Sequence, residues 1–202
     1  MTQKYLSTAL TESVRRAQQQ YYGRSAAALD VSDRDSLGDA EAAFITARDS
    51  FYLGSVSETG WPYVQHRGGP TGFLRILDRG TLAFGDYQGN HQLISTGNLL
   101  VNDRVTLFLI DYRNRQRLKI FGHARIKDAR DVAEGTLQLM GEMLRTKVER
   151  VIIIDVAGYD WNCPKYITPR YSTEEVEQLV RSQRERISEL ESELASLPTR
   201  DP

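Results

Sequence analysis

The amino-acid sequence predicts a mainly β fold, an antiparallel barrel flanked by N- and C-terminal helices. Three observations indicate this class. About seven runs between residues 51 and 161 are apolar, or alternate apolar with polar residues as strands do. Most of these runs are joined by short turns, several of them containing glycine, and short links favour antiparallel pairing. The alternation of strand and helix that builds a parallel sheet is absent.

The chain before the first strand predicts helices and a loop. Its first segment carries apolar side chains at the spacing of one helix face, namely Leu6, Leu10, Val14 and Ala17. Residues 25–38 are rich in Asp, Ser and Ala and predict a loop. Asp39 is then a plausible N-cap for a short helix that continues to Ala47.

The strand region begins at Phe51. The predicted strands are, in order, FYLGSVS (51–57), WPYVQHR (61–67), FLRIL (73–77), TLAF (81–84), RVTLFLID (104–111), RLKIFGHARI (117–126) and VIIIDVAGYDW (151–161). The run 104–111 is apolar on both faces apart from Thr106, which predicts a strand covered on both sides. The run 117–126 alternates, so one face should be buried and the other should meet solvent or a partner. A helical stretch over residues 132–144 precedes the last strand.

The C-terminal segment predicts an amphipathic helix. Its core positions are spaced by four and three residues in alternation, at Val176, Val180, Gln183, Ile187, Leu190, Leu194 and Leu197. Ser172 or Thr173, followed by two glutamates, makes a suitable helix start. Two interpretations stay open: the helix packs on its own barrel, or it pairs with the same helix of a second subunit. Gln183 at a core position weakens the second slightly.

The sequence thus predicts three regions: an N-terminal helix and loop (1–37), a barrel domain (38–171) and a C-terminal helix (172–202). Lys plus Arg number 26 and Asp plus Glu number 27, a net charge of −1, so we expect neither nucleic acid nor a membrane surface as partner. The single cysteine, Cys163, excludes an intrachain disulfide. No apolar signal-peptide core opens the chain, and we expect a soluble cytoplasmic protein.

Polar residues gather in the segment GDYQGNHQLISTGNLLVNDR (85–104). Backbone N–H groups at a helix start, with hydroxyls beside them, form an anion site. The candidate ligands here are Gln88, Asn90, Gln92, Ser95 and Thr96. The segment contains no lysine, and simple helix capping is the alternative.

Two further segments carry candidate ligands. Gln65, His66 and Arg67 end a strand, and the forked guanidinium of Arg67 suits a phosphate; a solvated strand edge is the alternative. The stiff segment 160–170, with two prolines, holds Trp161, which could stack on an aromatic ligand, and Arg170, which could pair with an anion. The alternative is a connector in which Trp161 plugs the core.

No catalytic residue is assigned. Cys163 has no identifiable basic or acidic partner in the sequence, so a nucleophilic role is disfavoured. The three histidines, at positions 66, 91 and 123, lack a metal-ligand spacing, and no metal is expected.

The order of these segments resembles the pyridoxamine 5′-phosphate oxidase-like family of flavin-binding split barrels, and its general FMN-binding branch rather than the oxidase itself. The resemblance covers about residues 40–170 and is carried by ETGWPYVQHR, GNHQLISTGNLLVNDRV and RLKIFGHARI. It implies a split β-barrel of six or more strands, a homodimer, and one FMN per subunit at the dimer interface.

The resemblance also implies positions for the cofactor. Gln65 and His66 fall on the ring and ribityl side, and Arg67 on the phosphate side. The family's usual Arg-Lys pair in the phosphate loop is replaced here by Ile94 and Ser95, so the phosphate charge must be met in another way.

On the sixth strand, Arg117 is the nearest match to a polar position that touches the flavin, with Lys119 as its neighbour. Trp161 and Arg170, nine residues apart, resemble a Trp and Arg pair that reaches the flavin from the partner subunit. The motif that binds pyridoxal phosphate in true oxidases is not recognisable, so the substrate does not carry over.

We therefore expect a homodimeric FMN-dependent oxidoreductase that passes a hydride or electrons between an electron donor and a small-molecule substrate, both unidentified. The rival hypothesis is a flavin-binding protein without turnover, a redox sensor or FMN carrier. A third keeps the fold and changes the cofactor to a deazaflavin or haem.

Overall fold

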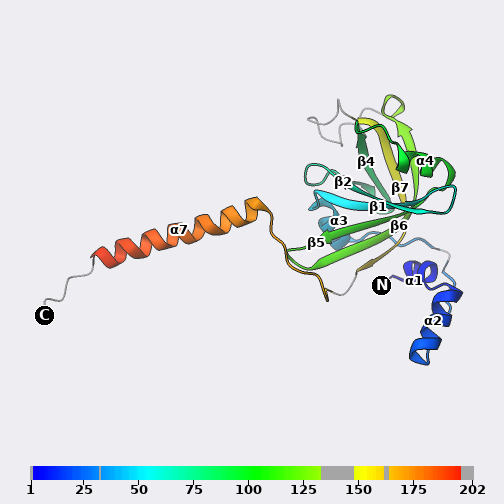
Figure 1. The fold of residues 1–202 in the computed structure, drawn as a ribbon, viewed down its shortest axis with the longest axis horizontal. Coiled ribbons are helices and arrows are strands. Elements are labelled where there is room, and N and C mark those ends of the chain that lie inside the picture. The colour runs from blue at the N-terminus through cyan, green and yellow to red at the C-terminus, as the bar shows by residue number, and fades with distance from the viewer. Residues whose placement is uncertain (1, 32, 133–147, 162–163, 197–202) are drawn as a thin grey trace.

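The computed structural model describes residues 2–31, 33–132, 148–161 and 164–196, and within them the chain forms one antiparallel sheet of seven strands (Figure 1). The strands are β1 (Ser50–Val56), β2 (Pro62–Gly68), β3 (Arg75–Asp78), β4 (Thr81–Tyr87), β5 (Arg104–Asp111), β6 (Gln116–Asp128) and β7 (Val148–Trp161). Their order across the sheet is β2-β1-β5-β6-β7-β4-β3. The sheet curls into a split barrel, which confirms the predicted fold class and all seven predicted strands.

The interior of the barrel is filled from alternate positions of the strands. On β6 the predicted inward face is buried, with Leu118 and Ile120 fully inaccessible, while His123 on the other face is exposed. On β5 the prediction holds for one face only: Val105, Leu107 and Leu109 are buried, whereas the face that carries Phe108 is half-covered. The outer face of β5 is therefore apolar without being enclosed by this chain.

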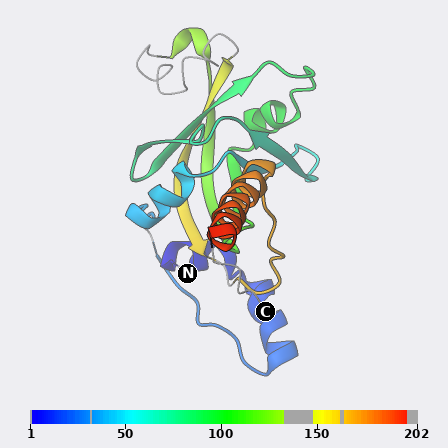
Figure 2. The same ribbon diagram turned by 90° about the vertical axis from the view of Figure 1, so that its left-hand side faces the viewer.

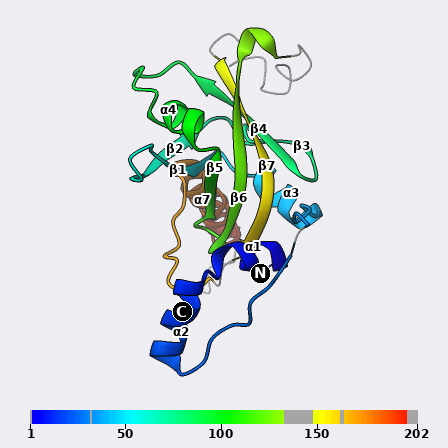
Figure 3. The same ribbon diagram turned by 90° about the vertical axis from the view of Figure 1, so that its right-hand side faces the viewer.

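The N-terminal prediction of one continuous apolar face is wrong. Two helices, α1 (Gln3–Ala9) and α2 (Glu12–Tyr22), meet at a break where the Thr11 hydroxyl accepts a hydrogen bond from the Val14 N–H at 3.4 Å. This threonine cap ends the continuity of the face. Helix α1 crosses the ends of β6 and β7 (Figure 3), where Tyr5 stacks on Phe121 with ring centroids 4.6 Å apart.

Helix α3 (Asp39–Thr46) begins at the predicted residue, but its N-cap lies one residue before the predicted cap, Asp39. Gly38 is the N-cap, and its N–H donates to the Glu41 carboxylate at 2.9 Å, so Asp39 lies in the first turn. The residues before it, 25–38, form no helix or strand where described, as predicted. The fourth helix, α4 (Ile94–Val101), lies between β4 and β5 in the chain.

The C-terminal helix α7 (Thr173–Ser196) extends away from the barrel, and Figure 2 looks nearly along its axis. Its predicted start is confirmed: the Ser172 N–H donates to Glu175, and the Glu175 N–H donates back to the Ser172 hydroxyl. No residue of α7 is buried, so the interpretation that it packs on its own barrel is wrong. The predicted helix beyond Val132, and Cys163, lie outside the described residues.

No helix among the described residues is long and apolar enough to cross a membrane. This holds for α7 as well, whose apolar side chains form a stripe among charged ones.

The close packing of β6 against β7 gives a first testable prediction. A Cβ added at Gly122 would lie 2.6 Å from Ile154 Cγ2 and 2.9 Å from the backbone oxygen of Asp155, so one strand must shift. Gly122→Ala should lower the free energy of unfolding by about 1–3 kcal/mol, as overpacking does. Guanidinium unfolding followed by circular dichroism measures this.

The matched control is Gly97→Ala in α4, where an added Cβ meets nothing within 4 Å. Alanine favours a helix over glycine by roughly 0.5–1 kcal/mol, so this variant should be slightly stabilised. Equal stability of the two variants would contradict the tight β6–β7 contact.

Candidate functional site

A small polar cavity of about 90 Å³ lies between the end of β2, the end of β4 and the start of α4. Its lining contains six of the residues predicted as cofactor ligands: Gln65, Arg67, Asn90, Gln92, Ser95 and Thr96. These residues come from two segments about thirty positions apart in the sequence. The structure therefore brings the strand end and the loop before α4 together around one cavity.

The alternation of β2 decides which of its side chains enter this cavity. Gln65 pairs with Leu53 and Arg67 pairs with Phe51 across the β1–β2 ladder, so both lie on the face that those buried side chains occupy. His66 pairs with Tyr52 on the opposite face, where the two rings meet at 5.5 Å. His66 therefore does not join the cavity, because neighbouring strand residues point to opposite faces.

The chain enters α4 through two residues with left-handed backbone, His91 (φ 59°) and Leu93 (φ 52°). In the same turn, the side-chain oxygen of Asn90 accepts a hydrogen bond from the backbone N–H of Gln92 at 3.2 Å. Ser95 is buried, and its hydroxyl donates to the Gln65 side-chain oxygen at 2.7 Å. The first-turn N–H groups of α4 have no intrahelical acceptor, as at any helix start, and they adjoin this cavity.

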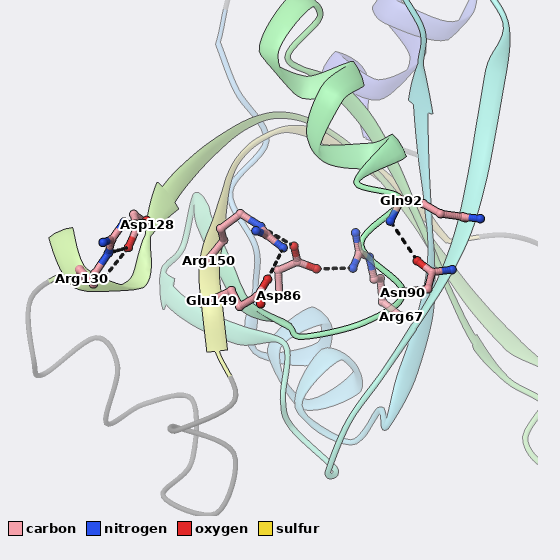
Figure 4. A network of polar contacts seen from close by, with 8 residues as sticks. All are labelled: Arg67, Asp86, Asn90, Gln92, Asp128, Arg130, Glu149 and Arg150. Atoms are coloured by element: carbon pink, nitrogen blue, oxygen red, sulfur yellow. Dashed lines mark hydrogen bonds and ion pairs between the residues drawn. The ribbon is translucent and has the colours of Figure 1, made fainter.

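A buried ion-pair network adjoins the cavity, which two of its members, Arg67 and Asp86, line (Figure 4). Asp86 on β4 accepts from Arg67 Nη1 at 2.5 Å through one oxygen and from Arg150 Nε at 2.9 Å through the other. Arg150, on β7, also contacts Glu149 at 2.9 Å. The Nε–H of Arg67 is buried and has no hydrogen-bond partner in the structure. This arginine, which lines the cavity, thus keeps one guanidinium donor that is not used within the fold.

This network also joins the two sides of the split barrel. β2 is an edge strand, and β4 and β7 are neighbours toward the other end of the strand order. No backbone ladder therefore joins β2 to β4 or to β7. Burial acts against the charge on Arg150, but its hydrogen bond and its attraction to Asp86 and Glu149 outweigh burial and raise the pKa of its guanidinium. Asp86 and Arg150 were not predicted from the sequence. The available signal was an aspartate that directly follows the apolar run TLAFG.

The remaining predicted residues lie away from this cavity. Gln88 is exposed in the loop after β4, and Arg117 on β6 pairs across the ladder with Ile110 of β5. The Arg170 guanidinium lies 4.8 Å from the centre of the Tyr112 ring. Within one chain, these three residues do not line the cavity.

Trp161 is held in the fold itself, as the core-plug alternative predicts. Its indole N–H donates to the buried Glu41 carboxylate at 2.6 Å, and its ring meets Phe44 edge-on at 4.8 Å. The tryptophan therefore attaches α3 to the end of β7.

A second, larger groove of about 690 Å³ lies on the outer face of the sheet. It is mostly apolar and is bordered by Tyr52, Val64, Thr106, Phe108, Phe121 and His123, from four adjacent strands. Tyr63 borders both this groove and the small polar cavity. A polar, phosphate-sized cavity and an apolar groove thus meet at one residue.

These features define a class, a split-barrel protein with a polar cavity beside an apolar sheet face. The family model described as pyridoxamine 5′-phosphate oxidase matches residues 37–157, more than half of the chain, and the chain belongs to that family. It is a family of flavin-binding proteins that includes oxidases and reductases. No curated protein sequence matches the chain.

Several solved structures are similar to this chain at low sequence identity. HupZ of Group A Streptococcus is 14% identical, with 67% of this chain covering 100% of that one at a TM-score of 0.50. A general stress protein 26-related protein of Clostridium acetobutylicum is 12% identical over 61% of this chain and 85% of its own, with a TM-score of 0.44. An F420 reductase is 14% identical over 61% and 98%, with a TM-score of 0.45. The likeness to HupZ supports the fold alone.

The ion-pair network gives a second prediction. Asp86→Asn removes the charge between two largely buried guanidinium groups and should lower the free energy of unfolding by on the order of 2–4 kcal/mol. Inorganic phosphate should restore more stability to this variant than to the wild type, because the anion replaces the missing charge. Thermal unfolding at increasing phosphate concentration measures both effects.

Glu12→Gln is the control, since it makes the equivalent change in an exposed ion pair with Arg16 on α2, away from this network. Its unfolding temperature and its response to phosphate should match the wild type. If Asp86→Asn had the same unfolding temperature and the same response to phosphate as this control, the network would not stabilise the fold or contribute to the cavity.

Proposed function

We propose that this protein binds FMN and acts as an FMN-dependent oxidoreductase. The observation that carries the proposal is the meeting of Arg67, Ser95 and Thr96 with the start of α4 in one small cavity. We assign the FMN phosphate to this cavity and the ring to the side of the apolar groove. The groove volume of about 690 Å³ lies within the roughly 300–1,000 Å³ typical of ligand sites.

The donors in the cavity suit a phosphate. The buried Nε–H of Arg67 lacks a partner, the α4 amides at its first turn lack intrahelical acceptors, and Thr96 adds a hydroxyl. The two guanidinium groups of this network are balanced by the carboxylates of Asp86 and Glu149, so hydrogen-bond donors, and not a surplus positive charge, would compensate for the absence of the family's Arg-Lys pair at Ile94 and Ser95. Glu149 lies on the Arg150 side and not in the lining of the cavity.

FMN, when bound, supplies a hydride acceptor and donor at N5 of its ring. The residues of this chain would then bind and orient it: Arg67 and the α4 start hold the phosphate, and Gln65, fixed by Ser95, presents its amide beside the ribityl chain. The hydride step needs no side-chain acid or base, so we assign no catalytic residue. The electron donor and the small-molecule substrate are not identified by this site.

We further propose a homodimer in which a second copy covers the outer sheet face. Val64 is 64% exposed and Tyr52 38% exposed on this face, and such apolar surface is characteristic of interfaces. In that arrangement the groove would be closed by the partner, and the exposed Arg170 would be available to the partner's site. The family resemblance implies the same arrangement.

Arg67→Ala should weaken FMN binding by on the order of 1.5–3 kcal/mol, about 10- to 150-fold in Kd, because a charge-assisted hydrogen bond is lost. Quenching of FMN fluorescence on titration with the protein measures the affinity. Arg125→Ala is the control, since Arg125 pairs with Asp155 away from both cavities. Unchanged affinity in Arg67→Ala would remove Arg67 from the site.

Turnover is tested on the FMN complex with NADH and NADPH as donors. We expect at least one nicotinamide to reduce bound FMN faster than free FMN, followed by reoxidation in air. Reduction at the rate of free FMN would instead favour a redox sensor or FMN carrier. A protein that refuses FMN but binds a deazaflavin would keep the site and change the cofactor.

A further inference from the structure

The C-terminal helix α7 carries an apolar stripe that no other part of the described chain covers. Its exposed large apolar side chains are Val176 (46%), Leu179 (50%), Val180 (39%), Ile187 (54%), Leu190 (46%) and Leu194 (73%). Five of these lie at the alternating four- and three-residue spacing of a coiled-coil seam. Near its start the helix is joined to the barrel by an ion pair in which Arg113 contacts Glu175 at 3.0 Å.

A helix whose apolar stripe is uncovered gains stability when that stripe packs against a partner. Most helical stability in proteins comes from packing of an amphipathic face, and isolated helices are only marginally stable in water. The 24 residues of α7 contain seven glutamates and three arginines, a net charge of −4. This charge disfavours an anionic membrane surface as the partner, because basic residues on the polar face bind such surfaces.

We infer that α7 pairs with α7 of a second copy of this chain as a parallel, in-register two-stranded coiled coil. The a positions are Val180, Ile187 and Leu194, and the d positions are Val176, Gln183 and Leu190. The β-branched Val180 and Ile187 at a and Leu190 at d follow the pattern that favours two parallel strands, from which Leu194 at a and Val176 and Gln183 at d depart. Leu190 and Ile187 supply the central layers of this seam.

The charges beside the seam complement one another in this arrangement. Arg186 occupies a g position and Glu191 the e position five residues later, so each Arg186 faces Glu191 of the other copy. In the single chain Arg186 contacts Glu189 at 2.8 Å on the same helix. Both of these partners are exposed, and Arg186 can therefore turn to the second helix at little cost.

Gln183 decides between parallel and antiparallel pairing. In a parallel, in-register pair, each d residue meets its own copy, so the two Gln183 amides hydrogen-bond to each other. In an antiparallel pair a d residue meets an a residue, and every a position of the apolar stripe is apolar: Val180, Ile187 or Leu194. Burying an amide against these side chains leaves it without a partner and costs free energy.

The pairing is tested by disulfide crosslinking of the full chain. Because Cys163 is the only cysteine, Cys163→Ser gives a background without thiols, into which Leu190→Cys (position d) or Gln178→Cys (position f) is introduced. Under mild oxidation, Leu190→Cys should form an interchain disulfide at least about tenfold faster than Gln178→Cys, which points away from the seam. Non-reducing gels measure both rates.

Two further variants keep the test decisive. Ile187→Asp added to Leu190→Cys should lower the rate to that of Gln178→Cys, with the circular dichroism of the barrel unchanged. Mixing the Ile187→Cys and Leu190→Cys proteins distinguishes parallel from antiparallel helices. Disulfides between two copies of the same variant support parallel pairing. A disulfide that forms only between one variant and the other overturns it. Equal rates for Leu190→Cys and Gln178→Cys would overturn the pairing altogether. None of these measurements involves flavin, so the coiled coil and the FMN site stand or fall separately.

Discussion

The barrel depends on one buried carboxylate, that of Asp86. It lies between the guanidinium groups of Arg67 on the edge strand β2 and Arg150 on β7, and so connects parts of the sheet that no backbone ladder joins. A split barrel has an opening where ladder hydrogen bonds end, and an ion pair buried there is stronger than one in water. The same contact fixes Arg67, which lines the polar cavity, so the ion pair that closes the barrel also positions a residue of the site.

A second set of polar contacts fixes α4 against the same edge. Ser95 donates to Gln65 of β2, and the Asn98 side chain donates to the buried Ser55 hydroxyl of β1 at 3.0 Å. Because these partners are buried, the start of the helix is held relative to the strands and not merely capped. A helix start held in this way can present its amides to a phosphate without reorganisation, which is a condition for tight binding.

The described part of the chain leaves two apolar surfaces uncovered, the outer sheet face and the seam of α7. They lie in different parts of the molecule and have different geometry: one is a broad groove on four strands, the other a narrow helical stripe. A homodimer covers both if the barrels meet across the sheet and the helices run side by side from the same end. The proposed parallel direction of the helices is compatible with such a two-fold arrangement, since both helices start at their barrels.

The sequence by itself determined the strands, the helical character of α7 and the two segments that build the cavity, because period-two and heptad patterns report local backbone geometry directly. It did not show that His66 turns away from its neighbours Gln65 and Arg67, although strand alternation contains that information. Only the tertiary structure decided that Asp86, paired with Arg150, lines the site and that Trp161 packs against the core. Those contacts join residues far apart in the chain, 64 positions between Asp86 and Arg150 and 120 between Glu41 and Trp161. Their partners are set by how the sheet curls and closes, and no local pattern in the chain encodes that closure.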